Sequence, residues 1–240
     1  MNNIFNKYEK NNLNETYDIF LNEYNNDPIL INHRSHIEHN NLGFGEKPFH
    51  VIWRELVKEL PNNFNFLEIG VYKGQVLSLV KLLSDNYEKS VKYVGVTPLD
   101  NSGDKFSNYE VTNYGKTIID LFNHFNLEFD INTNIINGLS TDELIKNKVR
   151  ELGEFDLIYI DGGHDYDCVV SDIKLMYDVS KLGTYVVFDD SSCFKNLSDD
   201  KFKGHIDVCN AIKDNLENNE QFIELICVGH NRVFKKIKHG

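Results

Sequence analysis

Short apolar segments alternate with longer segments of helical periodicity along most of this 240-residue chain. The apolar segments predict five strands, at residues 65–70, 92–98, 131–138, 155–161 and 183–190. The other segments predict helices, at residues 74–86, 115–127, 140–152, 167–182 and 205–218. Nearly continuous apolar strands that alternate with helices are typical of a parallel sheet covered on both faces. The alternation therefore predicts an α/β fold.

The C-terminal end departs from this alternation. Two apolar segments, 222–229 and 231–238, are separated only by a short polar turn around His230, which predicts an antiparallel hairpin. With the five preceding strands, this gives a seven-stranded, mostly parallel sheet that ends in an antiparallel hairpin.

The first 60 residues contain helical patterns and no strand pattern. Apolar residues at helical spacing predict helices at residues 14–25 and 48–61, the second ending at Pro61. A hydrophobic content of 41% is enough for one substantial core. We expect residues 1–60 to form a helical extension or cap on a single domain, residues 61–240.

Charge and cysteine content exclude some classes of function. The formal net charge of −12 argues against nucleic-acid binding, because phosphate contacts require a basic face. No apolar run is long enough to span a bilayer, and the N-terminus lacks a signal-peptide pattern, so no membrane partner is expected. The cysteines have no C-x-x-C spacing, which predicts unpaired thiols in a reducing, cytoplasmic compartment, at Cys168, Cys193, Cys209 and Cys227.

Residues 66–75, FLEIGVYKGQ, contain the most specific motif. An apolar strand reaches Glu68 and then opens into a turn with Gly70 and Gly74 before the helix of residues 74–86. Such a turn places backbone N–H groups at a helix N-terminus, where a ligand can approach a surface free of side chains. Glu68 stands where the dinucleotide-binding pattern G-x-G-x-x-G has its first glycine, which argues against an NAD-dependent oxidoreductase.

The form E-x-G-x-x-x-G resembles that of class I methyltransferases that use S-adenosylmethionine (SAM), and with it the chain resembles their Rossmann-like fold. The resemblance implies that the turn with Gly70, Val71, Tyr72 and Gly74 binds the methionine part of SAM, and that Glu68 meets its amino group. An ordinary strand-to-helix turn would show the same glycines.

The next two strand ends hold the other expected SAM contacts. The resemblance implies an acidic ribose-binding residue after the second strand, where this chain has Thr97 with Asp100 three residues beyond. Either side chain could bind the ribose. After the third strand, Gly138 and Ser140 match a turn that contacts adenine in the family; Ser140 could also cap the next helix, with Glu143 completing a capping box.

Three carboxylates, Asp161, Asp189 and Asp190, end the fourth and fifth predicted strands. If these strands are neighbours, the carboxylates converge and repel one another, which a hard cation such as Mg²⁺ or Mn²⁺ would relieve. The alternative is that Asp189 and Asp190 make only local hydrogen bonds at the strand end.

This arrangement resembles metal-dependent O-methyltransferases, especially those that act on sugars of macrolides and surface polysaccharides. The resemblance implies that Asp161, Asp189 and Asp190 bind the metal, that Asp161 also borders SAM and the reacting groups, and that His164 is the general base. Gly163 departs from relatives that have an acidic residue there. His164 could instead be a plain surface residue.

Two further segments carry open alternatives. The loop of residues 191–205 brings basic residues that could bind a phosphorylated or nucleotide-linked acceptor, or could be solvated: Lys195, Lys201, Lys203 and His205. His33, His36 and His39 would share a helix face and could bind zinc, be solvated or contact substrate. Their segment could form a lid, with Gly43 and Gly45 as flexible points.

The sequence thus predicts a cytoplasmic, SAM-dependent and Mg²⁺-dependent O-methyltransferase. Its expected acceptor is a small molecule, the hydroxyl of a sugar or sugar-derived metabolite in polysaccharide or natural-product biosynthesis. A homodimer is expected by analogy. The alternatives are a metal-independent methyltransferase that acts on nitrogen or another small molecule, and a SAM-binding protein without catalysis.

Overall fold

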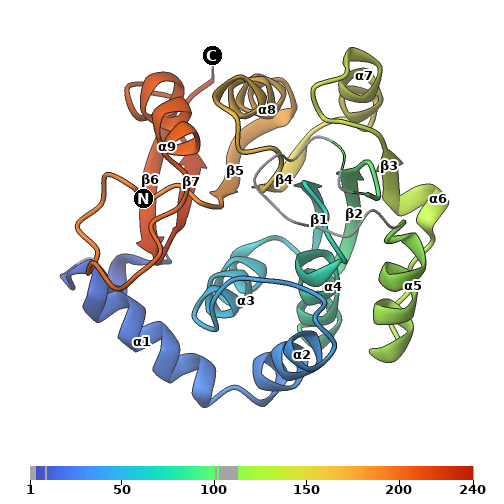
Figure 1. Ribbon diagram of the computed structural model, residues 1–240, viewed down its shortest axis with the longest axis horizontal. Coiled ribbons are helices and arrows are strands. Elements are labelled where there is room, and N and C mark those ends of the chain that lie inside the picture. Colours follow the sequence, from blue (N-terminus) through green and yellow to red (C-terminus); the bar gives the residue numbers. More distant parts are fainter. Residues whose placement is uncertain (1–3, 9, 101, 103–112, 240) are drawn as a thin grey trace.

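A computed structural model describes residues 4–8, 10–100, 102 and 113–239 of the chain. Seven strands form one sheet in the order β3-β2-β1-β4-β5-β7-β6 (Figure 1). Their bounds are β1 Asn63–Ile69, β2 Ser90–Thr97, β3 Ile135–Asn137, β4 Phe155–Ile160, β5 Ser180–Phe188, β6 Phe222–Val228 and β7 Asn231–Lys236. Strands β1 to β5 are parallel to one another, and β7 is antiparallel to both β5 and β6. The predicted fold class is confirmed.

The strand order reverses beside β1. From β1 the chain proceeds outward to β2 and β3 on one side, and then returns to place β4 on the other side. In parallel α/β sheets such a reversal leaves a crevice above the carboxyl ends of the central strands. The register pairs Ile69 at the end of β1 with Ile160 at the end of β4, so these two ends are level.

Helices cover both faces of the sheet. One face carries α3 Phe49–Glu59, α4 Gln75–Asn86 and α5 Gly115–His124, with α1 Leu13–Asn25 and α2 Pro28–His39 packed outside them (Figure 1). The other face carries α7 Glu143–Glu151, α8 Tyr166–Val179 and α9 Ile206–Ile212. Each face of the sheet packs against its helices in a separate hydrophobic core. Side chains along β1 point alternately to the two faces, so Phe66 packs into the first core, under α3, α4 and α5, and Leu67 packs into the second.

The structure corrects the prediction for residues 131–138. They begin with a short helix, α6 Ile131–Asn134, and only Ile135–Asn137 forms strand β3. The side chain of Asp130 accepts a hydrogen bond from the Asn132 N–H at 3.0 Å, which caps this turn. The Asn134 amide donates to the Tyr93 carbonyl of β2 at 2.9 Å and fixes the turn against the sheet.

Helix α2 is an element that the sequence analysis does not assign. Asp27 is its N-cap, accepting from the backbone N–H groups of Ile29 and Leu30, and Pro28 occupies the first helical position. Strand β5 begins at Ser180, three residues before the predicted start. The predicted helix of residues 205–218 forms as α9, which continues directly into a π-helix, Lys213–Glu217.

Two cysteines contradict the prediction of unpaired thiols. Cys193 and Cys209 form a disulfide with their Cα atoms 5.9 Å apart. The bond joins the loop after β5 to helix α9, a proximity that depends on how that loop returns to the sheet and that spacing along the chain does not reveal.

The predicted division at residue 60 stays a prediction. The first core contains Phe20 and Trp53 from the N-terminal helices together with Phe66 and Tyr159 from the sheet. Among the helices of the described residues, none is both long and apolar enough to cross a membrane.

Candidate active site

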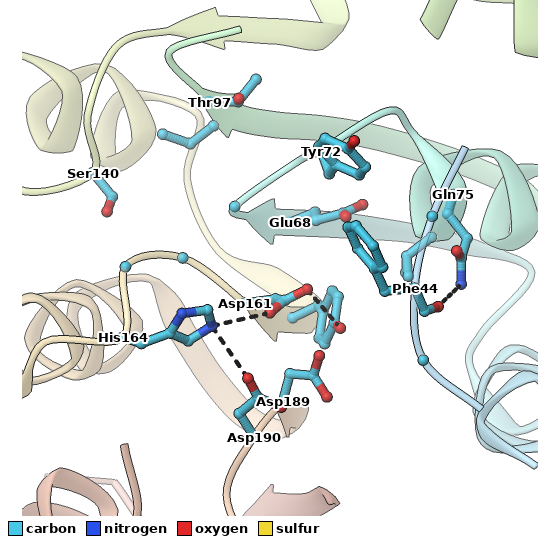
Figure 2. Close-up of a pocket in the computed structure, with 18 of the residues that line it drawn as sticks. Phe44, Glu68, Tyr72, Gln75, Thr97, Ser140, Asp161, His164, Asp189 and Asp190 are labelled. Atoms are coloured by element: carbon cyan, nitrogen blue, oxygen red, sulfur yellow. Dashed lines mark hydrogen bonds and ion pairs between the residues drawn. The ribbon is translucent and has the colours of Figure 1, made fainter. Parts of the chain in front are cut away.

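A cavity of about 780 Å³ lies above the carboxyl ends of the central strands (Figure 2). Most residues predicted from the sequence line it. They come from the ends of the five strands β1 to β5 and from the turns that follow: Glu68, Gly70, Tyr72, Thr97, Asp100, Gly138, Ser140, Asp161, His164, Asp189 and Asp190. Topology therefore brings together side chains that are separated by up to half of the sequence.

Val71 and Gly74 do not line this cavity. The Val71 side chain is buried in the first core, and Gly74 adopts a left-handed conformation (φ 87°) at the N-terminus of α4, close to Ile118. Gly70 is required by a close approach of strands, since a Cβ there would lie 1.8 Å from the Asp161 carbonyl oxygen. Gly70 thus permits the close approach of the chain after β1 to the end of β4, and it also lines the cavity.

Glu68 is a buried acid that lines the cavity. One side of the carboxyl group bonds to the backbone of Leu77 in α4, whereas Oε2 has no hydrogen-bond partner among the described residues. Burial raises the pKa of Glu68 to about 8. A cationic group delivered by a ligand would satisfy Oε2 and favour the ionised form.

The two ribose candidates occupy different environments. Thr97 is buried, and its hydroxyl oxygen accepts from the Leu99 N–H at 3.1 Å. Asp100 is exposed and accepts from the Ser102 N–H at 2.8 Å, and hydrogen bonds from Ser102 lower its pKa. Both line the cavity, and the assignment of the ribose contact to either stays a prediction.

The predicted capping box at Ser140 is wrong. Helix α7 begins at Glu143 with Asp142 as the N-cap, and the Glu143 carboxylate bonds to Arg150 within the helix instead of reaching back. Ser140 lies at the cavity wall, where Figure 2 places it on the same side as Thr97. Its predicted contact with adenine stays a prediction.

Acidic side chains and His164 meet at the ends of β4 and β5 (Figure 2). His164 Nε2 lies 3.3 Å from Asp190 Oδ2 and 4.0 Å from Asp161 Oδ1. Enclosure in the cavity, together with the charges of Asp189 and Asp190, raises the pKa of Asp161 well above its ordinary value. The Tyr159 hydroxyl donates to Asp161 Oδ2 at 3.1 Å and offsets part of this effect.

Two more histidines join this cluster. His205 Nε2 lies 3.4 Å from Asp190 Oδ2, and its ring stacks on His164 with centroids 4.4 Å apart. His230 Nε2 lies 3.3 Å from Asp189 Oδ1, which also accepts from the Asn231 amide at 2.6 Å. From the sequence, His205 is expected to contact a phosphorylated or nucleotide-linked acceptor or to be solvated, and His230 has no predicted role in the site. The predicted hairpin could have indicated that His230 lies near the site, because the pairing of β7 with β5 brings the hairpin turn beside the end of β5.

The cluster offers two sets of three possible metal ligands that share Asp190: His164, Asp190 and His205, and Asp189, Asp190 and His230. In each set the ligand atoms lie within 4.8 Å of one another. Mixed carboxylate and imidazole ligands suit a divalent transition metal such as Mn²⁺ at least as well as Mg²⁺, which prefers oxygen.

The lysines of the 191–205 loop do not line the cavity. Lys195 bonds to Glu224 at 2.7 Å, Lys203 bonds to Asp199 at 3.1 Å, and Lys201 lies over the ring of Tyr17. Their predicted contact with a phosphorylated acceptor therefore has no support in the geometry.

The three histidines of α2 are separated rather than gathered. His33 is buried and its Nε2 lies 3.0 Å from the Ser78 hydroxyl, while His36 stacks on His124 with ring centroids 3.6 Å apart. Within the described residues they form no three-ligand metal set. The segment after α2 does reach the cavity through Gly43, Phe44 and Gly45.

Comparison with known proteins gives a consistent result. The sequence profile of a family described as "Methyltransferase domain" matches residues 67–191. An uncharacterized protein of Acanthamoeba polyphaga mimivirus is 29% identical over 150 residues, which is 60% of this chain and 61% of that protein, so the match spans less than two thirds of the relative.

Similar folds occur in solved structures. An O-methyltransferase from Bacillus cereus in complex with S-adenosylhomocysteine (SAH) is 18% identical, with a TM-score of 0.56 over 88% of this chain and 91% of that one. The TDP-rhamnose 3′-O-methyltransferase of calicheamicin biosynthesis is 15% identical, with a TM-score of 0.54 over 92% and 93%. At these identities the likeness shows a shared fold.

Proposed function

The chain belongs to the methyltransferase domain family, and on that premise we propose that it transfers a methyl group from SAM to a hydroxyl of a sugar-type small molecule, with a divalent cation at the acid–histidine cluster. One observation carries the proposal. The cavity holds an unsatisfied buried acid, Glu68, on one side and a cluster of carboxylates and imidazoles on the other (Figure 2).

The Glu68 side of the cavity suits a nucleoside with an amino-acid tail. The orphaned Oε2 of Glu68 fits an ammonium group, and Gly70 leaves the adjoining wall without a side chain. Thr97, Asp100 and Ser140 follow along the neighbouring strand ends and supply polar groups for ribose and adenine. Proteins of similar fold bind SAH, which supports the same cofactor here.

The cluster on the other side suits a divalent cation. Three carboxylates in one enclosure repel one another, which the raised pKa of Asp161 reflects. Asp189 and Asp190 would hold the ion, and His205 and His230 add nitrogen ligands. Asp161 belongs to neither three-ligand set, and its role as a third carboxylate ligand rests on the sequence resemblance. A bound cation would lower the pKa of an acceptor hydroxyl beside it.

His164 is the proposed general base. Its Nε2 faces Asp190 Oδ2 at 3.3 Å, so the carboxylate orients the ring and stabilises the imidazolium formed when His164 takes the hydroxyl proton. SAM, held beside Glu68, would supply an electrophilic methyl group to this oxygen, and SAH would leave with the electron pair of the broken carbon–sulfur bond. Alignment of oxygen, methyl and sulfur supplies most of the rate, because transfer needs only an in-line approach.

The acceptor side of the cavity is aromatic, and among the described residues it contains no lysine or arginine. Phe49 and Phe202 line the cavity, and their rings lie 4.5 Å and 5.1 Å from the ring of His230, measured between centroids. Flat aromatic rings pack against the C–H faces of sugars, while no Lys or Arg among the described residues lines the cavity to meet a diphosphate. This favours an uncharged sugar-type acceptor over a nucleotide-linked one. The exclusion of nucleic-acid and membrane partners and the homodimer stay proposals.

A methyl-transfer assay tests the function. The full chain is incubated with SAM and panels of free sugars, glycosides, nucleotide sugars and catechols, and products are read by mass spectrometry. We expect one added methyl on a sugar hydroxyl, loss of activity with EDTA, and recovery with Mn²⁺ or Mg²⁺. Full activity in EDTA would contradict the role of the cation, and methylation of an amine alone would contradict the acceptor class.

Direct metal binding supplies a second readout. Asp190→Asn keeps the shape and tolerates the left-handed backbone at this position (φ 50°), but it removes the shared charge. We expect Mn²⁺ binding, followed by electron paramagnetic resonance, to weaken at least roughly 10-fold. The matched control is Asp199→Asn in the same loop, whose side chain is fully exposed and outside the cluster.

A further inference from the structure

His50 is a buried histidine whose two ring nitrogens have no hydrogen-bond partner among the described residues. It lies in the first turn of α3, is 1% exposed, and lines the cavity. A buried donor or acceptor left unsatisfied costs about 1–3 kcal/mol, and native proteins rarely leave one without a reason. A ligand in the cavity, which His50 lines, can supply the missing partner.

The surroundings of His50 favour an anion. Its ring lies 5.5 Å from the ring of His33 and 6.1 Å from that of Tyr24, measured between centroids. Burial, with His33 and Arg34 nearby, lowers the pKa of His50 well below its ordinary value, so the ring is neutral and keeps one N–H donor. The permanent positive charge of Arg34 near this N–H donor favours a carboxylate over an ammonium group as the partner.

Helix α4 connects His50 to Glu68. The Leu77 backbone bonds to the Glu68 carboxyl group, and the next residue, Ser78, bonds to His33, whose ring borders His50. Both His50 and Glu68 line the cavity, and each has an unsatisfied polar atom. One prefers a negative partner and the other a positive partner, which is the charge pattern that complements a zwitterionic amino acid.

We propose that His50 binds the α-carboxylate of the SAM methionine moiety by donating an N–H hydrogen bond, while Glu68 receives the α-ammonium group. This inference rests on the proposed function and adds a cofactor-binding residue from α3, outside the strand-end motifs. His50 sets affinity and specificity for the amino-acid part of the cofactor and takes no part in proton transfer.

The test removes the carboxylate from the ligand and the donor from the protein. Isothermal titration compares SAH with its decarboxylated analogue in the full chain and in three variants. His50→Leu removes the donor, and His50→Gln retains an N–H donor. His36→Leu is the control, because His36 lies in the adjacent helix α2 but stacks on His124 and does not line the cavity.

We expect the wild type to bind SAH roughly 10-fold or more tightly than the analogue, as befits a hydrogen bond to a charged group. His50→Leu should bring this ratio close to one, His50→Gln should restore part of it, and His36→Leu should leave it unchanged. A wild-type ratio near one, or equal weakening of both ligands by His50→Leu, would overturn the role of His50. Failure of the wild type to bind either ligand would instead overturn the proposed cofactor.

A spectroscopic measurement protects the test from a folding defect in His50→Leu. With ¹⁵N-labelled histidine, SAH should shift one imidazole resonance that is missing from the His50→Gln spectrum, and the decarboxylated analogue should leave that resonance in place. If SAH shifts no resonance assigned to His50, the inference fails even without the leucine variant.

Discussion

At the scale of single residues, Glu68 sets function against stability. Its pKa is about 8 in the folded chain because of burial, and the ordinary value is 4.5. Between these values the unfolded chain has released a proton that the folded chain retains, so stability falls as pH rises from 4.5 to 8, by at most about 1.4 kcal/mol per pH unit. Asp172, whose pKa burial raises to about 7, acts in the same direction.

Glu68→Gln should remove the contribution of Glu68. In denaturant unfolding of the ligand-free chain, we expect the variant to lose less stability than the wild type between pH 5 and pH 8, and to bind SAH more weakly. The exposed Glu59→Gln in α3 is the control and should follow the wild type. Parallel pH curves for wild type and Glu68→Gln would contradict a raised pKa at this site.

His164 is expected to affect chemistry rather than cofactor binding. His164→Gln should lower kcat by roughly 10²–10⁴-fold, the range for loss of a general base. SAH affinity measured by titration should stay the same, because the ring lies with the carboxylates at the ends of β4 and β5. His39→Gln, at an exposed position of α2, should leave both quantities unchanged. A His164 variant with normal kcat would move the base elsewhere.

A site residue can be predicted from the sequence when it lies at the end of a recognisable strand. Asp161 and Asp189 follow runs of apolar residues, so their position at the carboxyl edge of the sheet could be predicted before their distances were known. His230 lines the same cavity from the turn of the C-terminal hairpin, and His50 lines it from the first turn of α3. Their positions depend on the register of β7 against β5 and on the packing of α3, which no local pattern encodes.

At the scale of elements, α2 holds one wall of the cavity. Arg34 in α2 donates to the carbonyl oxygens of Phe44 and Gly45, each at 2.7 Å, and the Gln75 amide of α4 donates to Phe44 at 3.1 Å. These bonds fix an irregular segment at the cavity edge, where Phe44 stacks on Tyr72. A planar guanidinium can bind two carbonyl groups at once, which an ammonium group cannot do with the same geometry.

Arg34→Lys should therefore loosen this segment. We expect faster limited proteolysis between residues 40 and 47, weaker SAH binding, and a loss of stability of about 2 kcal/mol from broken charge-assisted hydrogen bonds. Arg150→Lys is the matched control, since Arg150 pairs with Glu143 and Asp178 far from the cavity. Equal cleavage rates for the two variants would contradict the proposal that Arg34 holds this segment in place.

Elements were predictable where periodicity was long and unbroken. Strands β1, β4 and β5 and the helices between them have continuous apolar patterns, so their type was evident. The prediction of a strand over residues 131–138 was wrong because polar side chains determine the backbone there. Asp130 caps a helical turn where the apolar residues alone indicate a strand. Helix α2 was not predicted because its histidines weaken the apolar periodicity, although Asp27 and Pro28 are a recognisable N-terminal signal.

At the scale of the whole molecule, one sheet provides both sides of the chemistry. The reversal of strand order beside β1 places the cofactor turn after β1 next to the carboxylates after β4 and β5. Because this arrangement follows from strand order alone, the relation between the two halves of the site could be predicted even where single contacts could not. Closing the cavity required the N-terminal helices, whose docking onto the sheet is a long-range packing outcome.

Cofactor choice is expressed in the stability of the whole chain. A ligand that binds only the folded state adds RT ln(1 + [L]/Kd), about 2.7 kcal/mol at 100 times Kd. For a chain of this size we expect SAH to raise Tm by about 5–10 °C. NAD at the same concentration should leave Tm unchanged, because Glu68 replaces the glycine of the dinucleotide pattern and its carboxyl group occupies the wall of the cavity. Glu68→Gln should shrink the SAH shift, whereas a shift with NAD alone would assign the cavity to a different cofactor.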